Sequence, residues 1–123
     1  MTRDMDLIRE ILFAVESRMD TLPQETTVKG YDRPTVIRHV QMLLEAGYLK
    51  GKQHPSESSH HPVITITDLS WEGHELISAV RNNGIWNEIK QRFGAELPKM
   101  PIVILKEIAI AFVRQQAMRP TDR

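Results

Sequence analysis

The pattern of apolar and polar positions begins with a helical period. Between Asp4 and about Met19, apolar side chains recur every three or four residues, which is the spacing of one helix face. Either Thr2 or Asp4 can cap the start, because each side chain can accept hydrogen bonds from the first unpaired backbone N–H groups. The pattern predicts an amphipathic helix with these inward positions: Met5, Leu7, Ile8, Ile11, Leu12, Val15 and Met19.

The helical period then breaks. Pro23 and Gly30 disfavour a helix across residues 20–31, and the segment 26–28 between them is β-branched. We therefore predict a loop with room for one short strand.

A second helical pattern runs from Arg33 to Ala46. Asp32 is placed to cap it, Pro34 is tolerated in the first turn because its missing N–H would have no partner there, and Gly47 is expected to end it in a left-handed conformation. The inward face is apolar: Val36, Ile37, Val40, Leu43 and Leu44. The other faces are mostly polar: Arg33, Thr35, Arg38, Gln41, Met42 and Glu45.

Alternation typical of strands follows. Residues 48–53 (YLKGKQ) and 63–69 (VITITDL) flank a polar segment, and in the second run apolar Ile side chains alternate with Thr. We expect an antiparallel hairpin around the exposed segment 54–62. Beyond it, Ser70 can cap a helix that runs from Trp71 to about Arg81, a short helix carries the apolar positions of 85–93, and a last helix starts after two prolines and ends near residue 116.

The order of these elements is typical of a winged helix, a small helical domain with a β-hairpin wing. The segments LLEAGYLKG (43–51) and ITDLSWEG (66–73) resemble that superfamily. We therefore predict an α+β, mostly helical fold in one structural domain. It comprises a winged-helix-like domain over residues 1–82, a helical C-terminal extension over 83–117 packed on it, and a frayed tail over 118–123.

The chain also resembles a particular family, the uncharacterised domain-of-unknown-function family 2513, which comprises small proteins of bacteria and their prophages. Four segments carry the resemblance: RDMDLIREIL, YDRPTVIRHVQMLLEAGYLKG, LSWEGHELISAVR and IWNEIK. It implies a fold and a bacterial or phage-related setting, and it brings no catalytic residues.

One feature departs from the general winged-helix plan. A complete helix-turn-helix has a helix that crosses the phosphate backbone before the helix that enters the major groove. Only residues 20–31 are available for it here, and they must also hold Pro23, Gly30 and the short strand. We therefore expect the first helix of the pair to be shortened or absent.

Composition and charge limit the possible partners. The 123 residues are 41% hydrophobic and 26% charged, which is the composition of a globular protein. Because 16 basic and 16 acidic side chains cancel, no long-range field draws the molecule toward a polyanion. Residues 29–61 contain five Lys or Arg residues and three Asp or Glu residues, which gives a local formal charge of +2. Phosphate binding would depend on this local patch, with His54, His60 and His61 adding charge at mildly acidic pH.

These observations favour duplex DNA binding by a small prophage-linked transcriptional regulator. Arg pairs with guanine and Gln with adenine, so the polar side of the second helix is suited to base edges and the nearby Lys side chains to phosphates. The candidate nucleic-acid-binding residues are Arg33, Thr35, Arg38, Gln41, Lys50 and Lys52. The alternative is a non-catalytic protein–protein interaction module on the same scaffold that does not bind DNA, which the zero net charge and the missing helix favour.

The sequence contains no residue pattern typical of a catalytic or metal site. The chain has no Cys, which excludes disulfides and thiolate zinc sites. His60 and His61 are adjacent, so they point to opposite sides of an extended segment, and no carboxylate pair lies at ligand spacing near them. We expect no enzyme activity, no metal and no cofactor.

The last helix is apolar around more of its circumference than one core contact needs. The sequence predicts a homodimer through this region, with the candidate interface residues Ile104, Ile108, Ile110 and Ala111. The alternative is that Trp86, Phe93 and the first helix cover the apolar surface within one chain. The apolar run 101–113 is too short for a membrane span and the start lacks the features of a signal peptide, so we expect a cytoplasmic protein without membrane contact.

Overall fold

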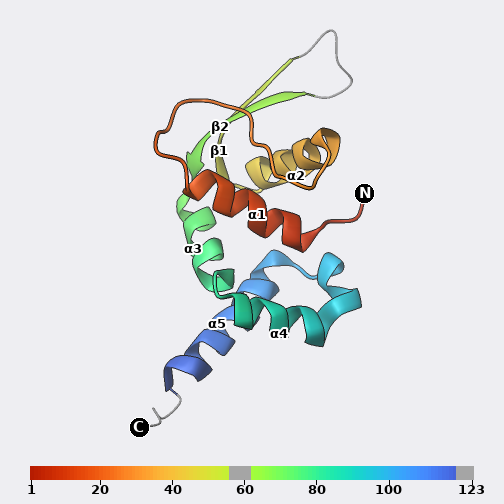
Figure 1. Ribbon diagram of the computed structural model, residues 1–123, viewed down its shortest axis with the longest axis vertical. Coiled ribbons are helices and arrows are strands. Elements are labelled where there is room, and N and C mark those ends of the chain that lie inside the picture. The colour runs from red at the N-terminus through yellow and green to blue at the C-terminus, as the bar shows by residue number, and fades with distance from the viewer. Residues whose placement is uncertain (56–61, 119–123) are drawn as a thin grey trace. The chain divides into compact units, whose positions relative to one another are not determined.

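A computed structural model describes residues 1–55 and 62–118 (Figure 1). The elements are α1 (Met5–Glu16), α2 (Arg33–Glu45), β1 (Leu49–His54), β2 (Val63–Leu69), α3 (Trp71–Val80), α4 (Asn83–Phe93), the 3-10 helix η1 (Gly94–Lys99) and α5 (Ile102–Met118). The predicted α+β, mostly helical fold is confirmed. The chain forms two compact units, one of residues 3–77 and one of residues 78 onward together with Met1 and Thr2.

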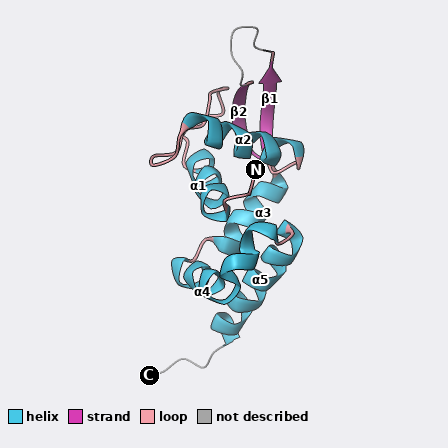
Figure 2. Ribbon diagram, turned by 90° about the vertical axis from the view of Figure 1, so that its right-hand side faces the viewer, coloured by secondary structure: helices cyan, strands magenta, loops and turns pink. Residues whose placement is uncertain are grey.

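The 3–77 unit packs two helices against an antiparallel hairpin. The strand β1 pairs with β2 from Leu49 opposite Leu69 to His54 opposite Val63, with one register shift next to Lys50. Helix α1 contacts β2, and α2 lies across both strands (Figure 2). The core of this unit includes Leu7, Ile11, Leu12, Val36, Val40, Leu49, Ile64, Ile66 and Leu69.

Three predicted helix caps are confirmed. The carboxylate of Asp4 accepts a hydrogen bond from the Leu7 N–H at 3.0 Å, and the hydroxyl of Ser70 accepts one from the Gly73 N–H at 3.0 Å. Asp32 caps α2 in the same way, with its carboxylate 3.2 Å from the Thr35 nitrogen. Each cap satisfies a backbone N–H group that has no partner inside its helix.

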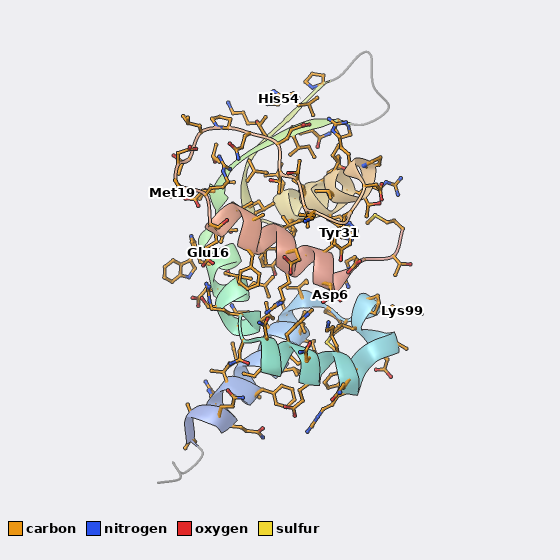
Figure 3. The ribbon with its side chains drawn as sticks, viewed as in Figure 1. Asp6, Glu16, Met19, Tyr31, His54 and Lys99 are labelled. Carbon is orange, nitrogen blue, oxygen red and sulfur yellow. The ribbon has the colours of Figure 1, made fainter. Side chains whose placement is uncertain are left out.

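Helix α1 ends earlier than the apolar spacing predicts. Its last residue is Glu16, and the side chain of Met19 is 100% exposed instead of continuing the inward stripe (Figure 3). The reason lies at Arg18, whose guanidinium donates to the backbone carbonyl of Ile66 at 2.6 Å and also to that of Leu22. These bonds hold the chain in a turn after α1 and direct Met19 away from the core.

The connection between α1 and α2, residues 17–32, contains no helix anywhere along its described length. The predicted short strand is reduced to a single antiparallel bridge, and it lies at Gln24 rather than at residues 26–28. There the Gln24 N–H donates to the Ile66 carbonyl at 3.3 Å, and the Ile66 N–H donates to the Gln24 carbonyl at 2.8 Å. The first helix of a helix-turn-helix pair is therefore absent, as the sequence predicts.

Two glycines fix the junction between the hairpin and its flanking helices. Gly47 ends α2 at φ +88°, the left-handed conformation that the sequence predicts there. Gly73, in the first turn of α3, lies so close to the residue before β1 that an added Cβ would stand 2.1 Å from the Tyr48 carbonyl oxygen. No larger side chain fits at Gly73 without moving the helix or the start of β1.

The second unit contains α4, η1 and α5. The Asn82 side chain caps α4 by accepting from the Ile85 N–H at 3.0 Å, a role that the sequence reading did not assign to it. Arg92 at the end of α4 lies over the ring of Phe112 on α5, 5.2 Å from its centroid, which joins the two helices. Among the residues described, no helix has the length and apolar character needed to cross a membrane.

Candidate nucleic-acid interface

Helix α2 buries one side and exposes the other. Val36, Ile37 and Val40 are buried on one face of the helix, and Ile37 and Val40 lie beside Ile64 of β2 and the connection before α2. Arg38 lies between them in sequence and is exposed. Its guanidinium is thus presented on the outward side of α2, near the middle of the helix.

Arg33 is already engaged by an acidic partner. Its Nη2 lies 2.7 Å from Oε1 of Glu25, which belongs to the connection before α2. Both side chains are well exposed, at 54% and 38%, so the pair is weak and open to competition. A phosphate that contacts Arg33 would have to compete with the Glu25 carboxylate.

Thr35 is used to cap its own helix. Its hydroxyl donates to Oδ1 of Asp32 at 2.8 Å, in addition to the backbone hydrogen bond of the cap. These hydrogen bonds, the Thr35 hydroxyl first, hold the pKa of the Asp32 carboxyl below its ordinary value. The carboxylate therefore stands at the N-terminus of α2, where the helix dipole would otherwise favour a phosphate.

An amide pair joins α2 to the hairpin. Nε2 of Gln41 donates to Oε1 of Gln53 on β1 at 3.1 Å. Each amide carries two N–H donors and a carbonyl oxygen, so the pair keeps donors and acceptors for other groups. Gln53 did not feature in the sequence-based prediction, although its two-residue spacing from Gly51 and Leu49 places it on the strand face that packs toward α2.

Lys50 and Lys52 lie on the other face of the hairpin. Side chains alternate along a strand, so Lys52 points away from the face that holds Gln53. Lys52 pairs with Thr65, and Thr65 contacts His54 through a hydrogen bond of 3.0 Å, so these side chains share the hairpin face opposite that of Gln53. The structure thus brings Arg38 near Gln41 and separates both from the two Lys side chains.

The histidines offer no metal site in the described part of the chain. Both ring nitrogens of His39 are occupied, Nε2 by the Asp4 N–H at 2.9 Å and Nδ1 by the Thr35 carbonyl at 2.8 Å. Within residues 1–55 and 62–118, no three His, Asp or Glu side chains cluster closely enough to hold a metal ion. His60 and His61 lie outside the described residues.

The candidate dimer residues on α5 fall on two sides of that helix. Ile104 is 43% exposed and Ala111 is exposed, whereas Ile108 and Ile110 are half-buried. The buried line of the helix runs instead through Leu105 and Ala109.

Comparison with known proteins gives a family match and a relative. The family model described as "Hypothetical protein (DUF2513)" matches residues 2–96. A protein of Haemophilus influenzae (strain ATCC 51907 / DSM 11121 / KW20 / Rd), described as "Uncharacterized protein", is 30% identical over 119 residues, which cover 94% of this chain and 98% of the relative. No solved structure matches the chain.

Proposed function

This chain belongs to the DUF2513 family, and we propose that it binds duplex DNA as a small transcriptional regulator linked to a prophage. In this proposal the 3–77 unit is a winged-helix-like module. Helix α2 enters the major groove and the hairpin β1–β2 is the wing beside it.

The observation that carries the proposal is the outward side of α2. Arg38 is exposed at its middle, and the Gln41–Gln53 amide pair lies where α2 meets the hairpin. Arg is suited to a guanine edge and a carboxamide to an adenine edge. The helix is fixed below them by its buried apolar side, so these side chains are held by a rigid element.

The net charge and the acidic side chains near α2 indicate how strongly the protein should bind DNA. The net charge is +0, Arg33 is paired with Glu25, and Asp32 stands at the start of α2. Few phosphates are therefore neutralised by one copy, and affinity for random DNA should be low. Tight binding would need a specific site and two copies of the chain on it.

Fluorescence anisotropy with labelled duplex fragments from the protein's own genomic neighbourhood tests the proposal, at low and at physiological salt. We expect one preferred fragment, and binding that weakens as salt rises. Arg38→Ala should weaken binding to that fragment by roughly 5- to 100-fold, the range for losing one base-edge contact.

Lys99→Ala is the matched control, because it removes the same charge from an exposed position outside the 3–77 unit. It should change affinity for the preferred fragment much less than Arg38→Ala. Equal losses in the two variants would show that α2 does not read the DNA. Absence of any binding at low salt would contradict the function itself.

A protein-interaction module is the second candidate, because two apolar side chains project from the connection that replaces the missing helix. Met19 is 100% exposed and Leu22 is 67% exposed. An apolar interface of this kind should persist at high salt, unlike phosphate binding. A partner that is retained at high salt by the wild type, and lost in Met19→Ser with Leu22→Ser, would favour this candidate over DNA binding.

A further inference from the structure

Helix α5 has a well-defined inward side. Leu105 is 3% exposed and Ala109 is 0% exposed, and the Phe112 ring lies under Arg92 of α4. These three positions are spaced by four and three residues, so they mark one line along the helix.

The opposite side of α5 carries two opposite charges among apolar neighbours. Glu107 and Arg114 are both exposed and lie seven residues apart, close to two helix turns, on one line of the surface. They are about 10 Å apart along the helix, too far to pair with each other, and neither forms an ion pair with any other described residue. Apolar and small side chains flank them: Val103, Ile104, Ile110, Ala111, Ala117 and Met118.

We propose that this side of α5 binds the same side of α5 in a second copy of the chain, with the two helices antiparallel. The two-fold axis passes between Ile110 and Ala111. With that register, Glu107 of each copy lies opposite the partner's Arg114. Both ion pairs follow from one symmetry operation, as in any isologous interface.

Charge complementarity is the reason for choosing a second copy in this orientation. The acidic and the basic residue are placed symmetrically about the midpoint of the stripe, so the surface is complementary to itself only when it is reversed. A parallel arrangement would place Glu107 beside the partner's Glu107.

This interface involves only part of the surface that the sequence predicts. Ile104, Ile110 and Ala111 belong to it, whereas Ile108 adjoins the buried Ala109 and lies toward the inward side. The inference does not depend on DNA binding. One pair of helices is a small interface, so we expect a dissociation constant on the order of micromolar.

Sedimentation equilibrium over protein concentrations from about 1 to 200 µM tests the proposal, because this range spans micromolar affinities. The wild type should be dimeric at the upper end. Glu107→Arg and Arg114→Glu should each weaken the dimer about tenfold or more, because each places like charges opposite one another at two symmetric positions. The double variant E107R/R114E should return to within about threefold of the wild type, because the two pairs are restored in exchanged form.

Lys106→Glu is the control, because it changes the net charge by the same amount as Arg114→Glu at a position beside the stripe. It should leave the dimer within about threefold of the wild type. Circular dichroism of each variant shows whether α5 still folds. A wild type that stays monomeric, single variants that dimerise as well as the wild type, or a double variant as weak as the singles would each overturn the proposal.

Discussion

The imidazole of His39 on α2 accepts a hydrogen bond from the backbone N–H of Asp4 at the start of α1, with 2.9 Å between Nε2 and the nitrogen. Because a backbone N–H can only donate, Nε2 must be unprotonated. Nδ1, 2.8 Å from the Thr35 carbonyl, therefore carries the proton of the neutral ring. The side chain is 1% exposed, so this single contact ties the N-terminus of α1 to the middle of α2 inside the 3–77 unit.

Replacing His39 should loosen this connection. His39→Ala leaves the Asp4 N–H without its acceptor and opens a cavity, and we expect it to lower the free energy of unfolding by about 2–4 kcal/mol. His39→Gln should lose less, because its side-chain oxygen can accept the same hydrogen bond. Urea denaturation followed by circular dichroism gives the comparison. Equal losses in the two variants would show that ring packing, not the hydrogen bond, is what stabilises the site.

Tyr31 should make the protein sensitive to alkali. It lies beside the first turn of α1 (Figure 3), and its pKa is raised above the ordinary 10.0 by partial burial and then by the carboxylates of Asp4, Asp6 and Glu10. In the unfolded chain the phenol ionises first, so the stability that Tyr31 contributes is complete below pH 10.0 and is lost as the pH rises through the higher folded pKa.

Tyr31→Phe is the variant that checks this. Its stability should fall less steeply than that of the wild type above pH 10.0, measured by urea denaturation at several alkaline pH values. Burial and Glu72 also raise the pKa of Tyr48, so some alkaline loss should remain in the variant. If the free energy of unfolding falls equally steeply with pH in the wild type and in Tyr31→Phe, Tyr31 does not cause the alkaline loss of stability.

Asp32 should give a corresponding dependence in acid. Hydrogen bonds from Thr35 lower the pKa of its carboxyl below the ordinary 3.8. The stability from this cap is therefore complete above pH 3.8 and is lost as the pH falls through the lower folded pKa. Asp32→Asn keeps a side chain that can cap α2 and removes this acid-dependent part, whereas Asp32→Ala removes the cap at every pH.

Thermal unfolding of the three proteins from neutral to acidic pH separates these effects. The difference in melting temperature between the wild type and Asp32→Asn should shift in favour of the Asn variant as the pH falls. If this difference in melting temperature is the same at every pH, the charge of Asp32 does not contribute to the cap.

Gly73 should be intolerant of even one added methyl group. Its added Cβ would lie 2.1 Å from the backbone oxygen of Tyr48, which cannot rotate away. We expect Gly73→Ala to lower the free energy of unfolding by about 1–3 kcal/mol, the usual cost of overpacking, despite the higher helix propensity of Ala.

Gly84→Ala is the matched control, because Gly84 also lies in the first turn of a helix. The atom nearest to its added Cβ, at 3.2 Å, is the side-chain oxygen of Asn82, which needs to shift by only a few tenths of an ångström and can keep its hydrogen bond to the Ile85 N–H. The change should stay within about 1 kcal/mol of the wild type. Similar losses in the two variants would show that the contact with Tyr48 is not limiting.

Most of what the sequence predicts correctly is local. The caps at Asp4, Asp32 and Ser70 and the left-handed turn at Gly47 depend on residues within a few positions of one another, so residue type and spacing identify them. The orientation of Lys50 and Lys52 was also accessible, because strand alternation places them opposite the buried Leu49.

The sequence by itself determined the order of the α-helices and of the two hairpin strands, where α2 begins and ends, and that no complete helix-turn-helix fits before it. Only the tertiary structure decided that Arg18 binds the Ile66 carbonyl, that Arg33 pairs with Glu25, and that His39 joins α2 to Asp4. The physical reason is that helix and strand formation is governed by neighbours along the chain. These other contacts join residues 8 to 48 positions apart, and packing alone brings them together.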